Sequence, residues 1–252
     1  MPEPTGRPLV RGFDVIVFDC DSTLTAIEGV DELARMKGLG GEVAVLTEAS
    51  MAGDVPLEAI YGRRLELLDP TDDDLVTLAA AYQANVVPDA RAAVAALQAA
   101  GRHVYIVSGG LAPVVQAFGS WLGVPVENIM AVPVDGAADA PLARSGGKPL
   151  VVGELLRSHE GRSVLIGDGA TDLEAQDTVD AFAAFAGVIA RPSVIADADL
   201  LITGDSLAPI VGLALTEDEE AAFLDTEHRA VVGESRRRIA AGELVALRER
   251  RR

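Results

Sequence analysis

The stretch FDVIVFDCDST, residues 13–23, decides the fold of this chain of 252 residues. Its first part, Phe13 to Phe18, is mostly β-branched or aromatic and predicts a buried strand that stops at Asp19. Asp19 and Asp21 follow the strand as two carboxylates spaced by two. Such carboxylates repel each other, and burial raises their pKa values unless a cation or shared proton compensates. The motif therefore indicates a functional site, and an Asp-rich turn or helix cap is the alternative that it leaves open by itself.

Similar apolar runs recur along the chain and predict the fold class. They span residues 103–107, 129–134, 163–166, 181–186 and 200–203, and residues 88–100 have the pattern of an amphipathic helix. Near-continuous apolar strands that alternate with such helices are typical of a parallel sheet covered on both faces. We therefore predict an α/β fold with a doubly wound (Rossmann-like) parallel sheet.

The region after the first strand has a different character. Residues 30–36, 42–51, 56–68 and 72–82 have helical patterns, and no convincing strand lies among them. Open α/β sheets bind ligands at the carboxyl ends of their strands, so a helical insertion here is expected to cover the site. We predict an α/β core of residues 1–23 and 87–215, a helical cap of residues 24–86, and a helical tail of residues 216–252 on the surface outside the core.

Composition excludes several classes of protein. The formal charge of −18 argues against a nucleic-acid binder or an anionic-membrane binder. No apolar run approaches the roughly 20 residues of a membrane span, and the N-terminus lacks a signal-peptide pattern, so we expect a cytoplasmic protein. The single cysteine, Cys20, excludes an internal disulfide and a Cys-based zinc cluster. A homodimer is compatible with the sequence.

Three further motifs are predicted at strand ends or helix starts. Gly167-Asp168-Gly169-Ala170-Thr171-Asp172 adds two carboxylates, and oxygen ligands without His or Cys suit Mg²⁺. Ser108-Gly109-Gly110 combines a hydroxyl with backbone N–H groups and predicts an anion site. Lys148, one of two lysines in the chain, enters a helix after two glycines. A carboxylate nucleophile, a second carboxyl, Mg²⁺ and a point cation together indicate phosphoryl transfer through an aspartyl-phosphate.

These motifs, in this order, resemble those of the haloacid dehalogenase superfamily of phosphatases, and more closely those of the phosphoserine phosphatase family. The stretches that match the latter are residues 28–34, 51–56, 63–65, 145–148 and 167–172. The resemblance implies that Asp19 is the nucleophile and that Asp21 is the acid and then the base. It also implies a metal site of Asp19, the backbone carbonyl of Asp21, and Asp168, with Asp172 supporting these ligands.

The resemblance further implies a set of residues that bind substrate. Phosphoryl oxygens would be bound by Ser108, Lys148 and the backbone of Gly109 and Gly110. Glu28 would face a substrate ammonium and Arg64 a substrate carboxylate, since the guanidinium is a planar fork for that group. Met51 would line the cap side, and Thr171 and Asp172 complete the predicted set.

The reaction implied is Mg²⁺-dependent hydrolysis of a small phosphate monoester, O-phosphoserine, to serine and phosphate. The same chemistry on phosphohomoserine or a sugar phosphate is the alternative, favoured by a segment of residues 132–148 that is shorter than in the family. A signalling module phosphorylated on Asp19 is a third hypothesis. The presence of Asp21 and of a cap argues against it, because a switch needs a long-lived acyl-phosphate.

Overall fold

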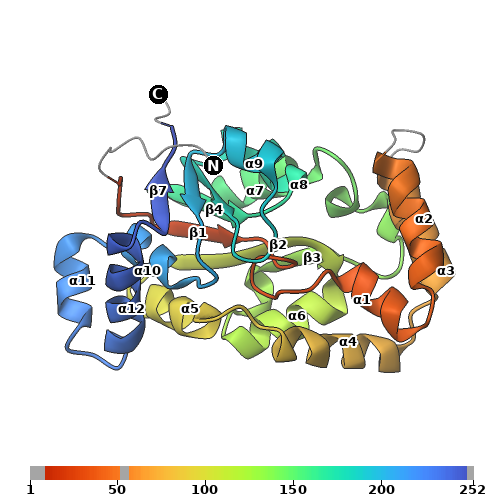
Figure 1. The fold of residues 1–252 in the computed structure, drawn as a ribbon, viewed down its shortest axis with the longest axis horizontal. Helices are drawn as coiled ribbons and strands as arrows, with labels where there is room; N and C mark the ends of the chain where they lie inside the picture. The colour runs from red at the N-terminus through yellow and green to blue at the C-terminus, as the bar shows by residue number, and fades with distance from the viewer. Residues whose placement is uncertain (1–8, 52–56, 249–252) are drawn as a thin grey trace.

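A seven-stranded sheet forms the centre of the protein in the computed structural model, which describes residues 9–51 and 57–248 (Figure 1). The strands lie in the order β3-β2-β1-β4-β5-β6-β7. The first six are parallel, and β7 pairs antiparallel with β6 at one edge. Their bounds are β1 Val15–Phe18, β2 His103–Leu111, β3 Ile129–Val132, β4 Ser163–Gly167, β5 Ala181–Phe185, β6 Leu200–Ile202 and β7 Leu244–Ala246. The predicted doubly wound α/β fold is confirmed.

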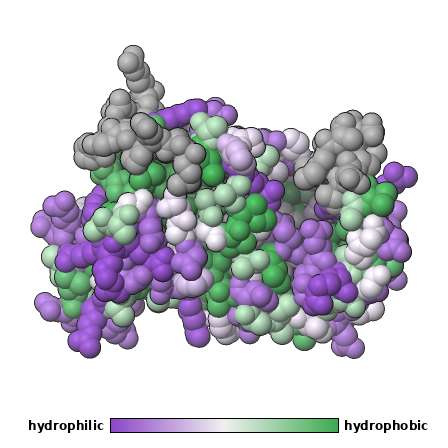
Figure 2. All heavy atoms as spheres, viewed as in Figure 1, coloured by the Kyte–Doolittle hydropathy of each residue, from purple (hydrophilic) through white to green (hydrophobic). Residues whose placement is uncertain are grey.

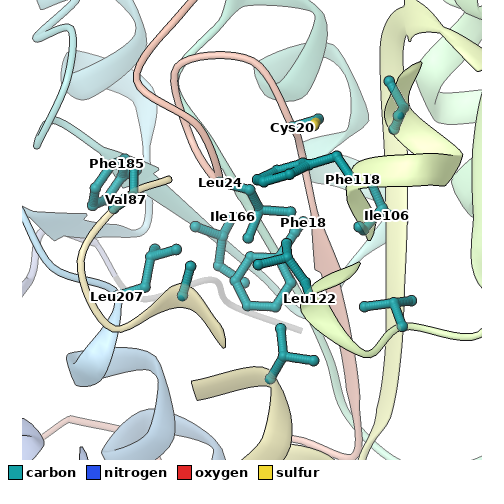
Figure 3. Packing of buried hydrophobic residues seen from close by; sticks show 14 of the residues in the cluster. Phe18, Cys20, Leu24, Val87, Ile106, Phe118, Leu122, Ile166, Phe185 and Leu207 are labelled. Atoms are coloured by element: carbon teal, nitrogen blue, oxygen red, sulfur yellow. The ribbon is translucent and has the colours of Figure 1, made fainter. Parts of the chain in front are cut away.

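The two faces of the sheet carry separate hydrophobic cores, because side chains alternate along each strand. On β1, Ile16 and Phe18 enter one core while Val15 and Val17 enter the other. The first core is covered by α5 (Ala90–Ala99), α6 (Ala112–Leu122) and α10 (Ala208–Ala214), the second by α7 (Gly147–Leu156), α8 (Ala170–Glu174) and α9 (Pro192–Asp197) (Figure 1). Figure 3 shows Phe18 of the first core beside Leu24 and Phe118. Each such side chain stabilises the fold by about 1.5–3 kcal/mol.

Four helices separate β1 from α5, in the region predicted to be helical. They are α1 (Gly29–Met36), α2 (Gly40–Met51), α3 (Leu57–Leu68) and α4 (Asp72–Ala84). Thr71 and Asp74 form a capping box at the start of α4, which satisfies backbone N–H groups there. The two ends of this helical segment meet, since Thr25 and Val86 form an isolated antiparallel bridge. The segment therefore leaves and rejoins the sheet region at one place, next to the end of β1.

The prediction that residues 216–252 lie outside the core is wrong for the part that the structure describes. After α11 (Glu217–Phe223), α12 (Arg229–Ala240) packs on α10 and buries Val231 and Val232, and β7 then extends the sheet. The charged residues of this segment favour a solvent-exposed position, but several of them pair with the body of the protein. Glu220 of the acidic start is buried and pairs with Arg11 at 2.9 Å, while the outer face of α11 and α12 is hydrophilic (Figure 2).

Strand β2 also differs from its prediction. It was expected to end at Val107, before Ser108-Gly109-Gly110, but it continues to Leu111, and α6 begins at Ala112. The pairing with β3 is irregular between Val107 and Leu111, then resumes at Leu111 opposite Val132. The predicted anion-binding residues therefore lie in an irregular strand end. No helix among the residues that the structure describes is long and apolar enough to cross a membrane.

Candidate active site

Lys148 joins two of the predicted motifs through ion pairs. Its Nζ lies 2.9 Å from Asp19 Oδ1, just after β1, and 2.6 Å from Asp172 Oδ1, in the first turn of α8. The lysine is in the first turn of α7 and only 4% exposed. Burial alone would lower the pKa of this ammonium, but Asp172 and Asp19 outweigh burial and raise it. A fixed positive charge therefore lies between two carboxylates at the ends of neighbouring strands β1 and β4.

Asp19, Asp168 and Asp172 form a cluster of acidic oxygens. One carboxylate oxygen of each lies within 4.8 Å of the others, and all three residues are buried. Burial raises the pKa of Asp168 to about 6, with a further contribution from Asp19 and an opposing one from Arg191, whose Nε is 2.9 Å from Asp168 Oδ2. Hard oxygen donors around excess negative charge fit a divalent cation such as Mg²⁺. Asp172, predicted to support the ligands from outside, lies within the cluster.

Glycine shapes this cluster at one critical position. A Cβ on Gly167 would lie 2.2 Å from Asp172 Cγ, so the close approach of β4 to Asp172 requires glycine. The backbone N–H of Gly169 donates to Asp172 Oδ2 at 2.9 Å, and Lys148 holds the other oxygen. Asp172 is therefore fixed on both sides, and its carboxylate cannot turn away from Asp19.

Asp21 lies apart from the acidic cluster. Its Oδ2 accepts from the backbone N–H of Gly29 at 2.8 Å, and its Oδ1 accepts from the hydroxyl of Tyr82 at 2.6 Å. Burial raises the pKa of Asp21 to about 7, with a smaller contribution from the negative charge of Glu28. An amide N–H only donates, whereas a hydroxyl can also accept, so this arrangement favours Oδ1 as the oxygen that carries a proton. Asp21 thus has the pKa and the surroundings of an acid–base group near neutral pH.

Glu28 immediately precedes α1 and lies beside the acidic cluster. Its Oε1 accepts from Ser22 Oγ at 2.8 Å and pairs with Arg191 Nη2 at 3.4 Å. Sequence analysis missed Arg191, which links Glu28 to Asp168. A lone arginine before a proline has the pattern of an ordinary surface charge, and no local signal distinguishes it.

The predicted anion-binding residues lie next to Asp21. Ser108 is buried, and its Oγ accepts from the N–H of Gly110 at 3.0 Å. A Cβ on Gly110 would lie 3.2 Å from Ser108 Oγ and 3.5 Å from Asp21 Oδ1, so both oxygens flank this glycine. The hydroxyl of Tyr61, on α3, donates to the carbonyl of Gly109 at 2.8 Å. The helical segment is therefore tied directly to the end of β2.

For Arg64, Thr171 and Met51, the structure gives fewer contacts than for the other predicted site residues. Arg64 is half-buried on α3, whereas its neighbour Arg63 is exposed. Burial and the charge of Asp21 raise the pKa of Tyr61, and the positive charge of Arg64 opposes this rise. Thr171 is half-buried in α8, next to Asp172. Met51 ends α2, but its side chain lies outside the described residues, so its predicted contact with substrate stays a prediction.

Known proteins share both the sequence and the fold. A family profile described as haloacid dehalogenase-like hydrolase matches residues 16–177. The phosphoserine phosphatases of Bos taurus and Homo sapiens are each 35% identical over 208 residues, covering 78% of this chain and 92% of the relative. A solved structure titled as a phospho-aspartyl intermediate analogue of phosphoserine phosphatase matches with a TM-score of 0.65 and 25% identity. It covers 80% of this chain and 98% of that chain.

The matched region contains the elements that build the site. It runs from β1 through α8 and so includes Asp19, Asp21, Ser108, Lys148 and Asp172. These residues meet at the carboxyl ends of adjacent parallel strands, where ligands bind in open α/β sheets. The family relationship and these relatives make the protein a phosphatase. The chain belongs to the haloacid dehalogenase-like hydrolase family.

Proposed function

We propose that this phosphatase hydrolyses O-phosphoserine to serine and phosphate in a Mg²⁺-dependent reaction through an aspartyl-phosphate on Asp19. The observation that carries the proposal is the meeting of Asp19 with Lys148, Asp168 and Asp172, with Asp21 beside Ser108 and Gly110. The named relatives are phosphoserine phosphatases, and they cover most of the chain. A small polar substrate is in keeping with the proposed cytoplasmic location.

The proposed metal would be held by Asp19, Asp168 and the backbone carbonyl of Asp21, with Asp172 supporting these ligands. The three carboxylates are buried, and one oxygen of each lies within 4.8 Å of the others. Bound there, Mg²⁺ would neutralise charge on the phosphoryl oxygens and on the nucleophile. Without it, one ammonium and one guanidinium face three carboxylates.

The chain's own residues account for both half-reactions. An oxygen of Asp19 attacks phosphorus, while the bond from phosphorus to the serine oxygen breaks. Lys148, Ser108 and the backbone of Gly109 and Gly110 hold the phosphoryl oxygens. The proton of Asp21 Oδ1 passes to the leaving oxygen.

The resulting Asp21 carboxylate then takes a proton from the water that hydrolyses the aspartyl-phosphate. A pKa of about 7 suits a group that gives and then takes a proton.

Selection for an amino acid would come from opposite charges on the cap side. Glu28 would bind the substrate ammonium, and its position beside Ser22 and Arg191 fixes the direction of its carboxylate. Arg64 would bind the substrate carboxylate from α3, and the half-buried position distinguishes it from Arg63. Thr171 and Met51 complete the proposed substrate contacts.

Phosphohomoserine or a sugar phosphate remains the second candidate substrate. The specific observation is the segment before Lys148, where residues 137–139 and 141–143 form two single 3₁₀ turns. The first of these turns packs against α3, the helix that carries Arg64. A short segment beside the helix that carries Arg64 would give the substrate site a different shape from that formed by a longer segment, which is why another phosphate ester is the second candidate.

A panel of phosphate esters tests the proposal. We expect the highest kcat/KM for phosphoserine in the presence of Mg²⁺, with phosphohomoserine, a hexose phosphate and 4-nitrophenyl phosphate well below it. The Asp19→Asn variant is the control for contaminating phosphatase. No preference for phosphoserine over the other esters would overturn the substrate assignment while leaving the phosphatase chemistry in place.

A further inference from the structure

The acid–base carboxyl of Asp21 is held by a residue outside every motif of the sequence. The hydroxyl of Tyr82 lies 2.6 Å from Asp21 Oδ1, although 61 positions separate the two residues. Tyr82 belongs to the last turn of α4, near the point where the helical segment rejoins the sheet region. Among the described residues, this bond and that from the Gly29 N–H are the two hydrogen bonds that we find to the carboxyl.

Tyr82 is itself immobilised at several points. The residue is fully buried, and its ring packs edge-on against Phe118 with 5.6 Å between centroids. Its backbone carbonyl accepts from Thr25 Oγ1 at 3.2 Å. A Cβ on Gly29 would lie 2.1 Å from the Tyr82 hydroxyl, so the hydroxyl occupies the space that this glycine leaves. The phenol therefore has little freedom to move away from Asp21.

The oxygen that Tyr82 binds is the one directed towards the chemistry. A Cβ on Gly110 would lie 3.5 Å from Asp21 Oδ1 and 3.2 Å from Ser108 Oγ, which places Oδ1 on the side of the anion-binding residues. Without a partner for Oδ1, the carboxyl would be anchored through Oδ2 alone and could swing about that contact. Displacement of a reacting group by about 1 Å costs up to about 100-fold in rate.

We propose that Tyr82 is a positioning residue, whose hydroxyl holds Asp21 Oδ1 in place for proton transfer to the leaving oxygen. This inference rests on the proposed role of Asp21 as the acid. Tyr82 does not touch substrate in this arrangement. A purely structural role, in which the ring fills the core and its hydroxyl takes the nearest acceptor, makes different predictions.

The test compares Tyr82→Phe with Tyr105→Phe. Both variants remove one hydroxyl from a ring, and Tyr105 bonds to His159 away from the site, at 2.8 Å. Single-turnover experiments with enzyme in excess isolate the first half-reaction. Phosphoserine releases an alkoxide that needs a proton, whereas 4-nitrophenyl phosphate releases a stabilised phenolate that does not.

We expect Tyr82→Phe to slow single-turnover release of serine by about 10-fold or more, because a carboxyl that is displaced from the leaving oxygen transfers its proton less efficiently. Release of 4-nitrophenolate should fall by less than about 3-fold, because general-acid catalysis matters little for that leaving group. The KM for phosphoserine should stay within about 2-fold, since the hydroxyl does not contact the substrate in this proposal. Equal losses for both substrates, a change confined to KM, or rates like those of Tyr105→Phe would overturn the proposal.

A double-mutant cycle with Gly29 gives a second, separate test of the contact between Tyr82 and Asp21. Gly29→Ala should reproduce the slow release of serine, because its Cβ would displace the Tyr82 hydroxyl. In the Tyr82→Phe background the same substitution should cost much less. Losses that multiply would show that the two positions act independently and would contradict the proposal.

If the wild type does not act on phosphoserine, the proposed function fails on its own. The comparison then uses the alkyl phosphate that the wild type hydrolyses best.

Discussion

Replacing Asp168 with asparagine should stabilise the metal-free protein while removing its response to Mg²⁺. Asp168 is 4% exposed and lies within the cluster formed with Asp19 and Asp172. Its pKa rises from 3.8 in the unfolded chain to about 6 in the folded protein, mainly through burial and then through Asp19. The neutral form is thus favoured on folding. Asparagine resembles that neutral form in shape and has no charge to desolvate.

The sign and size of the stability change caused by Asp168→Asn follow from the linkage between protonation and folding. A carboxyl with a raised folded-state pKa contributes stability that is complete below pH 3.8 and is lost as the pH rises through about 6. The rise in pKa from 3.8 to about 6 means that, at a pH well above 6, the ionised Asp168 lowers the free energy of unfolding by about 3 kcal/mol. For a protein of this size, that is a rise in Tm of roughly 6–12 °C for Asp168→Asn at pH 8. The gain should shrink towards zero near pH 4.

Mg²⁺ should reverse the order of the two proteins. A cation at 1,000 times its Kd stabilises the wild type by about 4.1 kcal/mol, which exceeds the advantage of about 3 kcal/mol that the metal-free variant has at pH 8. The variant lacks one carboxylate ligand and should respond weakly. Thermal unfolding at pH 8 and pH 4.5, with EDTA or with a Mg²⁺ series, measures both effects.

Asp74→Asn is the matched control. The partners Lys37 and Thr71 lower the pKa of Asp74 to about 2, so its replacement should decrease Tm at pH 8. A metal-free Asp168→Asn protein less stable than the wild type, or an unchanged Mg²⁺ response, would refute the reasoning.

Three other substitutions test the rest of the site. Asp19→Asn should abolish turnover and leave the circular dichroism spectrum unchanged; residual turnover above background would exclude Asp19 as the nucleophile. Arg64→Ala should decrease kcat/KM for phosphoserine far more than for an aryl phosphate, and equal losses would contradict a carboxylate contact. Tyr61→Phe removes the bond to the Gly109 carbonyl, a contact worth about 1 kcal/mol, and should lower kcat/KM by about 5-fold and Tm by roughly 2–4 °C. An unchanged kcat/KM would show that this contact does not matter for substrate capture.

The fold was predictable because its signals are local. The apolar runs that form β1 and β4 are continuous in the sequence, and the polar residues that follow them, such as Asp19 and Asp168, must lie at one edge of a parallel sheet. Lys148 was predictable by its rarity in the chain and by the two glycines before it. In the structure Lys148 pairs with Asp19 and Asp172, and Asp168 lies in the same acidic cluster.

The parts that escaped prediction depend on contacts between distant segments. Tyr82 lies 61 positions from Asp21, and Arg191 lies 163 positions from Glu28. A tyrosine in an apolar helical pattern is indistinguishable from an ordinary core residue until the partner is placed. The three residues of β7 are too few to reveal a strand, and its charged surroundings favour a surface segment in any local analysis.

The antiparallel strand β7 has a consequence for solubility. It covers the backbone N–H and carbonyl groups of β6, whose three residues are all buried. An uncovered, apolar strand edge is a template on which another polypeptide can add and propagate. Proteolytic removal of the chain from Leu244 onward would therefore produce a species prone to edge-to-edge aggregation, even though every residue of the proposed catalytic machinery would still be present.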